Sequence, residues 1–359
     1  MPASGLASLG GELVYRTAPP AKLPFMQRNH HRLVSLVPIV LMHMNQSCSY
    51  SETSKRIDFQ SDLVAGYRAT ISGEDLLYHS PIPYVDRSLL VRSLDRENHI
   101  EWETARVPDG FAAEDATFVM MAAIDVSDDV RQFDMLVNDT LAFTFENPNR
   151  TDIDRLVWTG YEGVSAEFRI TEIDKYDDAI GFLYLTVPRP MWEERRSLRL
   201  KVAGESAGER TWFMVYKEPI TPSVTLRNTP AILRGGEEGN RQSIRADFLY
   251  LGDIGHLIMD APGTHVDTTL SLGYAQHLLP VRAVDRPTTT DIEIGMDGER
   301  YSTSFSVSPV EQMDVYLIHH THLDIGYTHH QSEVERLQWQ HLEAVSYTHL
   351  TLPTMLAQC

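Results

Sequence analysis

The sequence predicts a mainly β protein: two β-sandwich domains followed by the first strand and helix of a truncated β/α barrel. Between residues 57 and 309 no long helical stripe of apolar residues appears, and short strand patterns dominate. Leucine and valine alternate with basic residues at 198–202, and isoleucine and methionine alternate with glutamate and glycine at 292–296. Such alternation is typical of strands with one buried face, and many short strands separated by turns indicate sandwiches.

Two further patterns predict strands at particular positions. Asp297-Gly298 separates the run at 292–296 from a second alternating run at 301–310, which is a strong β-hairpin signal. An apolar run over residues 182–187 ends at Pro188, which is typical of a strand buried inside a sandwich.

Loop signals divide this β region into two domains. Pro219-Ile-Thr-Pro222 marks a boundary, and the glycine-rich segment 235–240 is a second loop signal. We therefore expect a first sandwich over residues 55–220 and a smaller one over residues 221–312, with the barrel segment over residues 313–345.

Composition limits the classes of function. The chain has 359 residues and a formal net charge of −19, which argues against nucleic acid as a partner because phosphates attract basic surfaces. Its 42% hydrophobic and 23% charged residues are ordinary for a globular protein. The two cysteines are Cys48 and Cys359, and no structural disulfide is expected between them.

The N-terminal region predicts export. Residues 26–32 are basic, residues 33–42 form a short apolar run, and Cys48 follows shortly afterwards. This is the layout of a signal peptide over residues 26–48, too short to span a membrane. Cys48 is a candidate lipidation site of bacterial lipoprotein type, which would anchor the chain to a membrane. We expect a secreted or periplasmic protein, with residues 1–25 as a spurious or disordered leader.

A candidate metal site lies near the C-terminus. The apolar run Val315–Ile318 predicts a buried strand, and His320, His322 and Asp324 follow it at every second residue. Because side chains alternate along a strand, these three fall on one face at the strand end. Imidazole nitrogen and carboxylate oxygen are donors that zinc accepts. The alternative without a metal is that these three residues are ordinary polar side chains in a loop.

The sequence His320-Thr-His-Leu-Asp-Ile-Gly-Tyr327 resembles the opening of the catalytic domain of glycoside hydrolase family 38, the retaining α-mannosidases. The resemblance covers residues 315–345, about a tenth of the chain. It implies that His322 and Asp324 are the first two zinc ligands, and that Tyr327 stands at the substrate-binding position where the family often has tryptophan.

The same resemblance implies zinc as cofactor and a mannose-containing glycan or other carbohydrate as partner. In the family, the nucleophile and the other zinc ligands lie far downstream, so the catalytic residue of this chain is unknown and the fragment is expected to be inactive. The chain is thus expected to be the N-terminal part of a zinc-dependent retaining glycosidase.

Two alternatives stay open. A truncated metal-dependent amidohydrolase also places a His-x-His pair after its first barrel strand, here His320 and His322. A non-catalytic protein could instead bind carbohydrate through its sandwiches, since such modules often flank glycosidases. For this binding, sugar rings could stack on tryptophan, although most tryptophans in a sandwich belong to the core. The candidates are Trp102, Trp158, Trp192 and Trp212.

The last segment predicts one helix and then a break. Thr328 and Gln331 fit a capping box, and Val334, Leu337 and Leu342 form a partial helical stripe over residues 329–344. Residues 346–359 resemble a translated sequencing-adapter read-through, a threonine-rich tail that breaks the stripe and contains Pro353.

Overall fold

The structure, a computed structural model, describes residues 54–126, 129–233, 239–310 and 330–356. Its architecture is mainly β, as the sequence predicts, with three sheets in which nearly all neighbouring strands are antiparallel. The strand expected at residues 315–318, and with it the start of a barrel, lies outside the described residues.

The largest sheet has eight strands. Their order is β10-β11-β12-β7-β14-β5-β4, and β2 pairs in parallel with the first part of β7. In chain order the strands are β2 (Leu63–Ala65), β4 (Glu74–Leu77), β5 (Arg87–Arg92), β7 (Asp115–Asp125), β10 (Arg155–Thr159), β11 (Ser165–Ile173), β12 (Asp178–Pro188) and β14 (Trp212–Tyr216).

A five-stranded sheet supplies the second layer of the first sandwich. Its order is β3-β6-β13-β8-β9. The strands are β3 (Ala69–Ser72), β6 (His99–Glu103), β13 (Arg199–Gly204), β8 (Gln132–Val137) and β9 (Thr140–Glu146). The short helices η1 (Tyr161–Gly163) and α2 (Arg189–Trp192) lie in connections.

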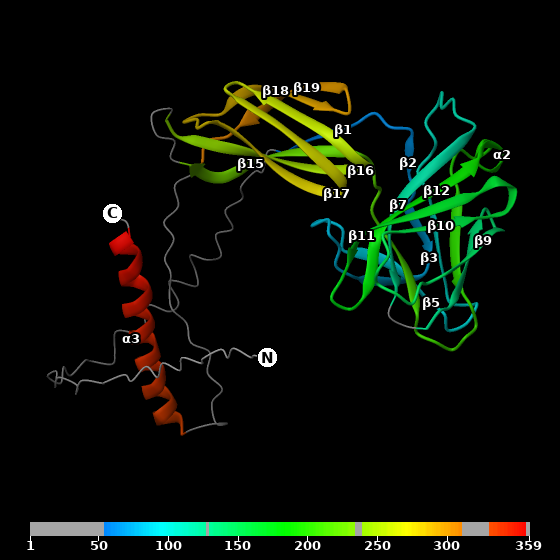
Figure 1. The fold of residues 1–359 in the computed structure, drawn as a ribbon, viewed down its shortest axis with the longest axis horizontal. Coiled ribbons are helices and arrows are strands. Elements are labelled where there is room, and N and C mark those ends of the chain that lie inside the picture. The colour runs from blue at the N-terminus through cyan, green and yellow to red at the C-terminus, as the bar shows by residue number, and fades with distance from the viewer. Residues whose placement is uncertain (1–53, 127–128, 234–238, 311–329, 357–359) are drawn as a thin grey trace, which may run out of the picture. The chain divides into compact units, whose positions relative to one another are not determined.

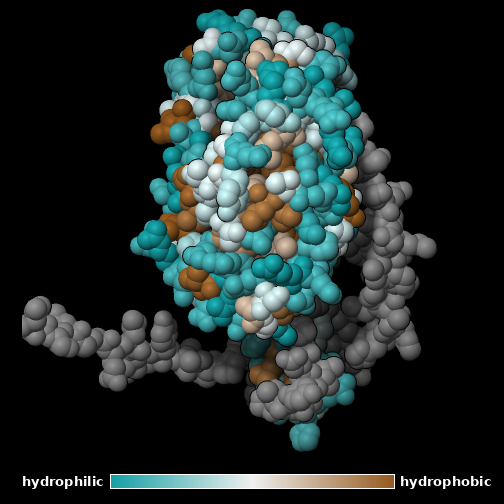
Figure 2. Space-filling view, turned by 90° about the vertical axis from the view of Figure 1, so that its right-hand side faces the viewer, coloured by the Kyte–Doolittle hydropathy of each residue, from teal (hydrophilic) through white to brown (hydrophobic). Residues whose placement is uncertain are grey.

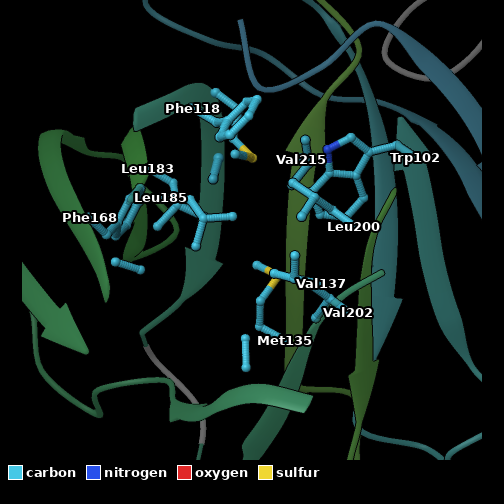
Figure 3. Packing of buried hydrophobic residues seen from close by; sticks show 14 of the residues in the cluster. Trp102, Phe118, Met135, Val137, Phe168, Leu183, Leu185, Leu200, Val202 and Val215 are labelled. Atoms are coloured by element: carbon cyan, nitrogen blue, oxygen red, sulfur yellow. The ribbon is translucent and has the colours of Figure 1, made fainter. Parts of the chain in front are cut away.

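The core of this sandwich lies between the two sheets. Figure 3 shows side chains from both layers meeting there, with Phe118, Leu183 and Leu185 opposite Leu200 and Val202. Every one of these five residues is at most 2% exposed. The alternation seen in residues 198–202 is therefore the alternation of β13, which buries Leu200 and Val202 in this core.

The eight-stranded sheet is buried on its other face as well. Along β7, Phe118 and Met120 belong to the core between the sheets, whereas Val119 and Met121 belong to a second apolar cluster. That cluster is completed by Leu249 and Leu251 of β16 and by Leu272 and Tyr274 of β17, and the Tyr184 hydroxyl donates a 2.7 Å hydrogen bond to the Leu251 carbonyl. Burial on both faces over most of their length explains the long apolar runs in β7 and β12, because only the end of the outer face at Thr117 and Thr186 stays open.

The third sheet has six strands in the order β1-β15-β16-β18-β19, with β17 paired to β16, and Figure 1 shows these strands lying together. Its strands are β1 (Ser54–Asp58), β15 (Ser223–Leu233), β16 (Arg241–Ala261), β17 (Thr264–Arg282), β18 (Thr288–Met296) and β19 (Glu299–Val307). β16 pairs with β15 along its first half and with β18 along its second, and a register shift separates Tyr250 from Ile254. Side chains from both halves share one core, which includes Phe248 and Met259.

The predicted hairpin at Asp297-Gly298 is confirmed. β18 and β19 pair from Thr288↔Val307 to Met296↔Glu299, and the two residues between them have φ of 51° and 91°. Positive φ at both central residues is the requirement of the tight hairpin turn that matches strand twist.

The first described strand joins the third sheet. β1 pairs antiparallel with β15, from Ser54↔Arg227 to Asp58↔Ser223. Residues 54–58 therefore add an edge strand to the sheet of residues 223–307, although they precede the first sandwich in sequence. The boundary expected at residues 219–222 coincides with the connection from β14 to β15.

The helix expected after the motif is present as α3 (Gln331–Leu356), with Val334 buried and Leu337 and Leu342 half-buried. The break expected from residue 346 onward does not occur, because the helix continues through Pro353. A proline removes one backbone donor and crowds the carbonyl of the preceding turn, but Pro353 stands in the last turn of α3, close to its end at Leu356. Within the described residues no helix is both long and apolar enough to cross a membrane.

We expect Gly181→Ala to destabilise the protein, because the backbones of β11 and β12 lie very close together at Gly181. A Cβ at this position would lie 2.0 Å from the Arg169 carbonyl oxygen, and backbone cannot yield as a flexible side chain does. Gly181→Ala should lower the free energy of unfolding by about 2 kcal/mol or more. Gly298→Ala adds the same methyl group where nothing lies within 4 Å and only the positive φ opposes it, so it should cost about 1 kcal/mol.

Urea unfolding followed by circular dichroism measures both variants. Equal losses of unfolding free energy in the Gly181 and Gly298 variants would contradict the prediction that the strand contact at Gly181 causes the larger loss.

Candidate functional site

The residues predicted for the metal and substrate site are His320, His322, Asp324 and Tyr327, and all lie outside the described residues. So does Cys48, the candidate lipidation site. Within the part of the chain that the structure describes, no group of three or more histidine, cysteine, aspartate or glutamate side chains is arranged to hold a metal ion. The zinc hypothesis therefore depends on the sequence motif.

The four candidate tryptophans fall into two classes. Trp102 and Trp192 are at most 1% exposed, and their indole N–H groups donate to the backbone oxygens of Gly66 and Val187. These two are core residues. Trp158 and Trp212 are only partly buried, and Trp212 packs edge-on against Tyr78. Of these four candidates, only Trp158 and Trp212 have the exposure that stacking on a sugar ring needs.

Trp158 belongs to an aromatic group at one end of the first sandwich. It lies on β10, the edge strand of the eight-stranded sheet, and Phe143 and Phe145 lie on β9, the edge strand of the other sheet. The Phe143 ring is nearly parallel to the indole at 12° and 6.1 Å, and the Phe145 ring is tilted at 5.1 Å. Two buried phenylalanines therefore fix the orientation of a tryptophan at the open side of the sandwich.

A groove of about 460 Å³ adjoins this tryptophan. This volume lies within the range of about 300–1,000 Å³ that is usual for small-molecule sites. We call it the Trp158 groove; its lining residues are Val130, Gln132, Thr144, Phe145, Glu146, Asn147, Pro148 and Trp158. Figure 2 views the side of the molecule where α2 and β9 lie and shows apolar atoms exposed within a hydrophilic surround.

The polar wall of the Trp158 groove is built by strand pairing. Gln132 and Glu146 are opposite each other in the β8–β9 ladder, and the Gln132 amide donates to Glu146 Oε1 at 2.9 Å. Farther along the ladder, Thr144 donates to Asp134 at 2.6 Å. The buried Asn147 side chain accepts from the backbone N–H of Arg131 at 2.6 Å and so holds the end of β9 in place.

A second groove, of about 510 Å³, lies on the uncovered part of the outer face of the eight-stranded sheet. Arg155 and Arg169 flank Glu167 at 2.9 and 3.0 Å, and both arginines also approach Asp253 of β16, at 3.6 and 3.1 Å. The Arg169 guanidinium also lies 4.4 Å above the Tyr184 ring. Two cations and two anions form a closed ring, so these charges are already neutralised and tie the sheet to β16.

A buried acidic group occurs at the β11–β12 turn. The Tyr78 hydroxyl lies 2.5 Å from Asp178 and 3.1 Å from Asp174, and His79 Nε2 lies 2.9 Å from Asp174. Burial, together with the charges of Asp174 and Asp125, raises the pKa of Asp178 to about 6, against the opposing hydrogen bond from Tyr78. Burial and the adjacent carboxylates also raise the pKa of Tyr78 well above its usual value.

No sequence pattern signals this acidic group, because its members come from a turn and from a segment about 100 residues earlier. The run Asp174-Lys-Tyr-Asp-Asp178 resembles an exposed turn. The backbone bond from Asp174 N to Asp178 O, at 2.9 Å, instead folds both carboxylates inward.

Comparisons with known proteins do not identify a family for this chain. A scan against protein-family models finds no match, and a search of curated proteins finds none. Among solved structures, the chain is similar to a GH2 beta-galacturonidase from Eisenbergiella tayi bound to glycerol, at 8% identity, with 71% of this chain and 43% of that chain covered and a TM-score of 0.19. The chain therefore spans less than half the length of that enzyme. A similarity this low carries no functional argument.

We predict that the protonation of Asp178 makes folding pH-dependent. Its pKa of about 6 in the folded state exceeds the ordinary 3.8, so between these values the folded state holds a proton that the unfolded state has released. Stability attributable to this group is present at about pH 4 and is lost as the pH rises to 6. Asp178→Asn should remove about 1 to 2 kcal/mol of that decline.

Urea unfolding at several pH values tests this. Asp177→Asn, at the adjacent exposed position, is the matched control and should keep the decline. A parallel pH dependence in wild type and Asp178→Asn would show that this carboxyl does not titrate as proposed.

Proposed function

We propose that this chain is the N-terminal region of a zinc-dependent retaining glycosidase resembling the family 38 α-mannosidases. The observation that carries the proposal is the spacing of His320, His322, Asp324, Gly326 and Tyr327 after an apolar run. A histidine or aspartate alone at a strand end is common, but this combination joins metal donors to an aromatic group at fixed distances in the sequence.

The described residues around the motif agree with the proposal. β19 ends at Val307 before the motif, and α3 begins at Gln331 after it. An apolar run, a ligand-bearing segment and a helix form the order of one βα unit, and β/α barrels carry their chemistry at the carboxyl ends of their strands. The sandwiches would then be accessory domains that precede the catalytic barrel.

The donor types fit zinc. His322 would supply an imidazole nitrogen and Asp324 a carboxylate oxygen, and zinc in such a site would hold sugar hydroxyls. Tyr327 would contact the sugar ring. The motif itself does not include the pair of carboxylates that a retaining glycosidase needs.

Export is part of the same proposal. The basic segment 26–32 and the apolar run 33–42 support secretion or a periplasmic location, where a glycosidase would meet extracellular glycans. Anchoring through Cys48 would keep the enzyme at a membrane surface.

A second candidate function is carbohydrate binding by the first sandwich itself. The Trp158 groove favours it, because an oriented indole there lies beside a carboxylate and amides. Such binding could coexist with the glycosidase.

We predict that zinc and activity depend on His322 and Asp324 together. The 359-residue chain should not cleave an aryl α-mannoside, because two donors do not form a catalytic zinc site. In a longer gene product that continues past residue 345, His322→Ala and Asp324→Ala should each lower both bound zinc and hydrolysis by about 100-fold or more. Zinc is measured by mass spectrometry and hydrolysis by release of the aryl group.

His341→Ala changes a histidine on the exposed side of α3 and serves as the control, with zinc and activity unchanged. Full activity in either motif variant would remove that residue from the zinc site. A downstream sequence with a carboxylated lysine or histidine-rich set would instead support the amidohydrolase alternative.

A further inference from the structure

We propose that the Trp158 groove binds one ring of a neutral pyranoside, with the indole against the ring and the Gln132–Glu146 pair bonded to its hydroxyls. The proposal deepens the carbohydrate-binding function of the first sandwich and depends on that function. It concerns residues remote in sequence from the zinc motif, so the two can fail separately.

The orientation of the indole suits a sugar ring. A sugar ring has apolar C–H faces and a polar rim, and an aromatic side chain provides a flat apolar surface with a polar N–H at its edge. Phe143 and Phe145 hold Trp158 from within the sandwich, at 6.1 and 5.1 Å. The part of the indole that they leave uncovered lines the groove. Little conformational freedom is then lost when a ligand binds.

The indole N–H distinguishes Trp158 from the core tryptophans. Trp102 and Trp192 donate to backbone carbonyls at 2.8 and 3.1 Å. Among the described residues Trp158 has no such acceptor, so its indole N–H remains free to donate to a ligand. A core tryptophan normally finds a partner for this group when it is buried.

The paired polar side chains also suit a sugar. Gln132 uses its amide N–H to bind Glu146 Oε1, which leaves the amide oxygen and the second carboxylate oxygen as acceptors on two hydrogen-bonded side chains. Both residues are exposed on neighbouring strands, whose pairing sets their spacing. Adjacent acceptors suit the adjacent hydroxyl groups of a pyranose. A site built to bond hydroxyls discriminates strongly against ligands that lack them.

The charge around the groove is negative. Glu146 lines the groove, and Asp134 lies behind Thr144 at 2.6 Å. The nearby cation, Arg131, already faces Asp129 and Glu209 at 3.4 Å and Glu205 at 3.9 Å. An acidic sugar would meet uncompensated negative charge, whereas a neutral sugar would not. The groove therefore selects neutral pyranosides over uronates.

The test is isothermal titration of the full chain with methyl α-D-mannopyranoside, methyl α-D-glucopyranoside and glucuronate. We expect saturable binding of at least one neutral glycoside with a dissociation constant on the order of 1 mM, as for a small ligand with few contacts. Glucuronate should bind about tenfold more weakly or worse, because it adds a like charge beside Glu146. Trp158→Ala should weaken binding by about tenfold or more, and Glu146→Ala by about fivefold.

Two controls separate the groove from the rest of the sandwich. Val157→Thr changes the preceding residue, which lines the second groove, and Trp212→Phe changes the other partly buried tryptophan. Both should bind with an affinity close to that of wild type. Circular dichroism checks that Trp158→Ala is folded; if it is not, Glu146→Ala, at an exposed position, tests the groove in its place.

Three results would overturn the proposal: no saturable binding of either neutral glycoside, equal affinity for glucuronate, or unchanged affinity in the Trp158 or Glu146 variant. Each leaves the zinc assignment of His322 and Asp324 intact. Conversely, loss of the zinc assignment with sugar binding retained would contradict the glycosidase proposal and leave the groove as the binding site of a non-catalytic protein.

Discussion

The burial of both faces of the eight-stranded sheet is the constraint on which the rest of this structure depends. Alternate residues of β7 and β12 enter two different cores: Phe118 and Leu183 pack toward the five-stranded sheet, whereas Val119 and Phe182 pack toward β16 and β17. Because each face is covered, the two strands contribute apolar area on both sides, and burial of apolar area is the dominant favourable contribution to folding. The first sandwich and the sheet of residues 223–307 therefore share an apolar contact.

This constraint also explains where the polar groups gather. In the doubly covered strands β7 and β12, charged residues occur only at the strand ends, and other charges lie at the margins of the sheet, where several are paired. Arg155, Glu167, Arg169 and Asp253 form a closed ring beside the contact with β16. The carboxylates of Asp174 and Asp178 share the Tyr78 hydroxyl at the far end of β12, and burial there raises the pKa of Asp178 to about 6. Trp158 stands at the remaining margin, where edge strands of the two sheets meet and no further layer of the described residues covers them.

The two proposed functions occupy different parts of the chain. The zinc motif is local in sequence, since the two proposed donors, His322 and Asp324, and the aromatic Tyr327 fall within the segment 320–327. The Trp158 groove is assembled from β8, β9 and β10, whose lining residues extend from Val130 to Trp158. An accessory sandwich that binds a neutral sugar would raise the local concentration of glycan near a barrel that follows it.

The sequence by itself determined the fold class, the hairpin at Asp297-Gly298, the buried run in β12, and the helix that begins at Gln331, because each depends on the periodicity or turn chemistry of neighbouring residues. It also predicted His322 and Asp324 as metal donors, a prediction that still awaits its test. Only the tertiary structure decided that β1 joins the third sheet, that Trp102 and Trp192 are core while Trp158 lines a groove, and that Gln132 stands opposite Glu146. These outcomes depend on which strands become neighbours, and strand partners are selected by the burial of whole sheet faces, which no short segment encodes.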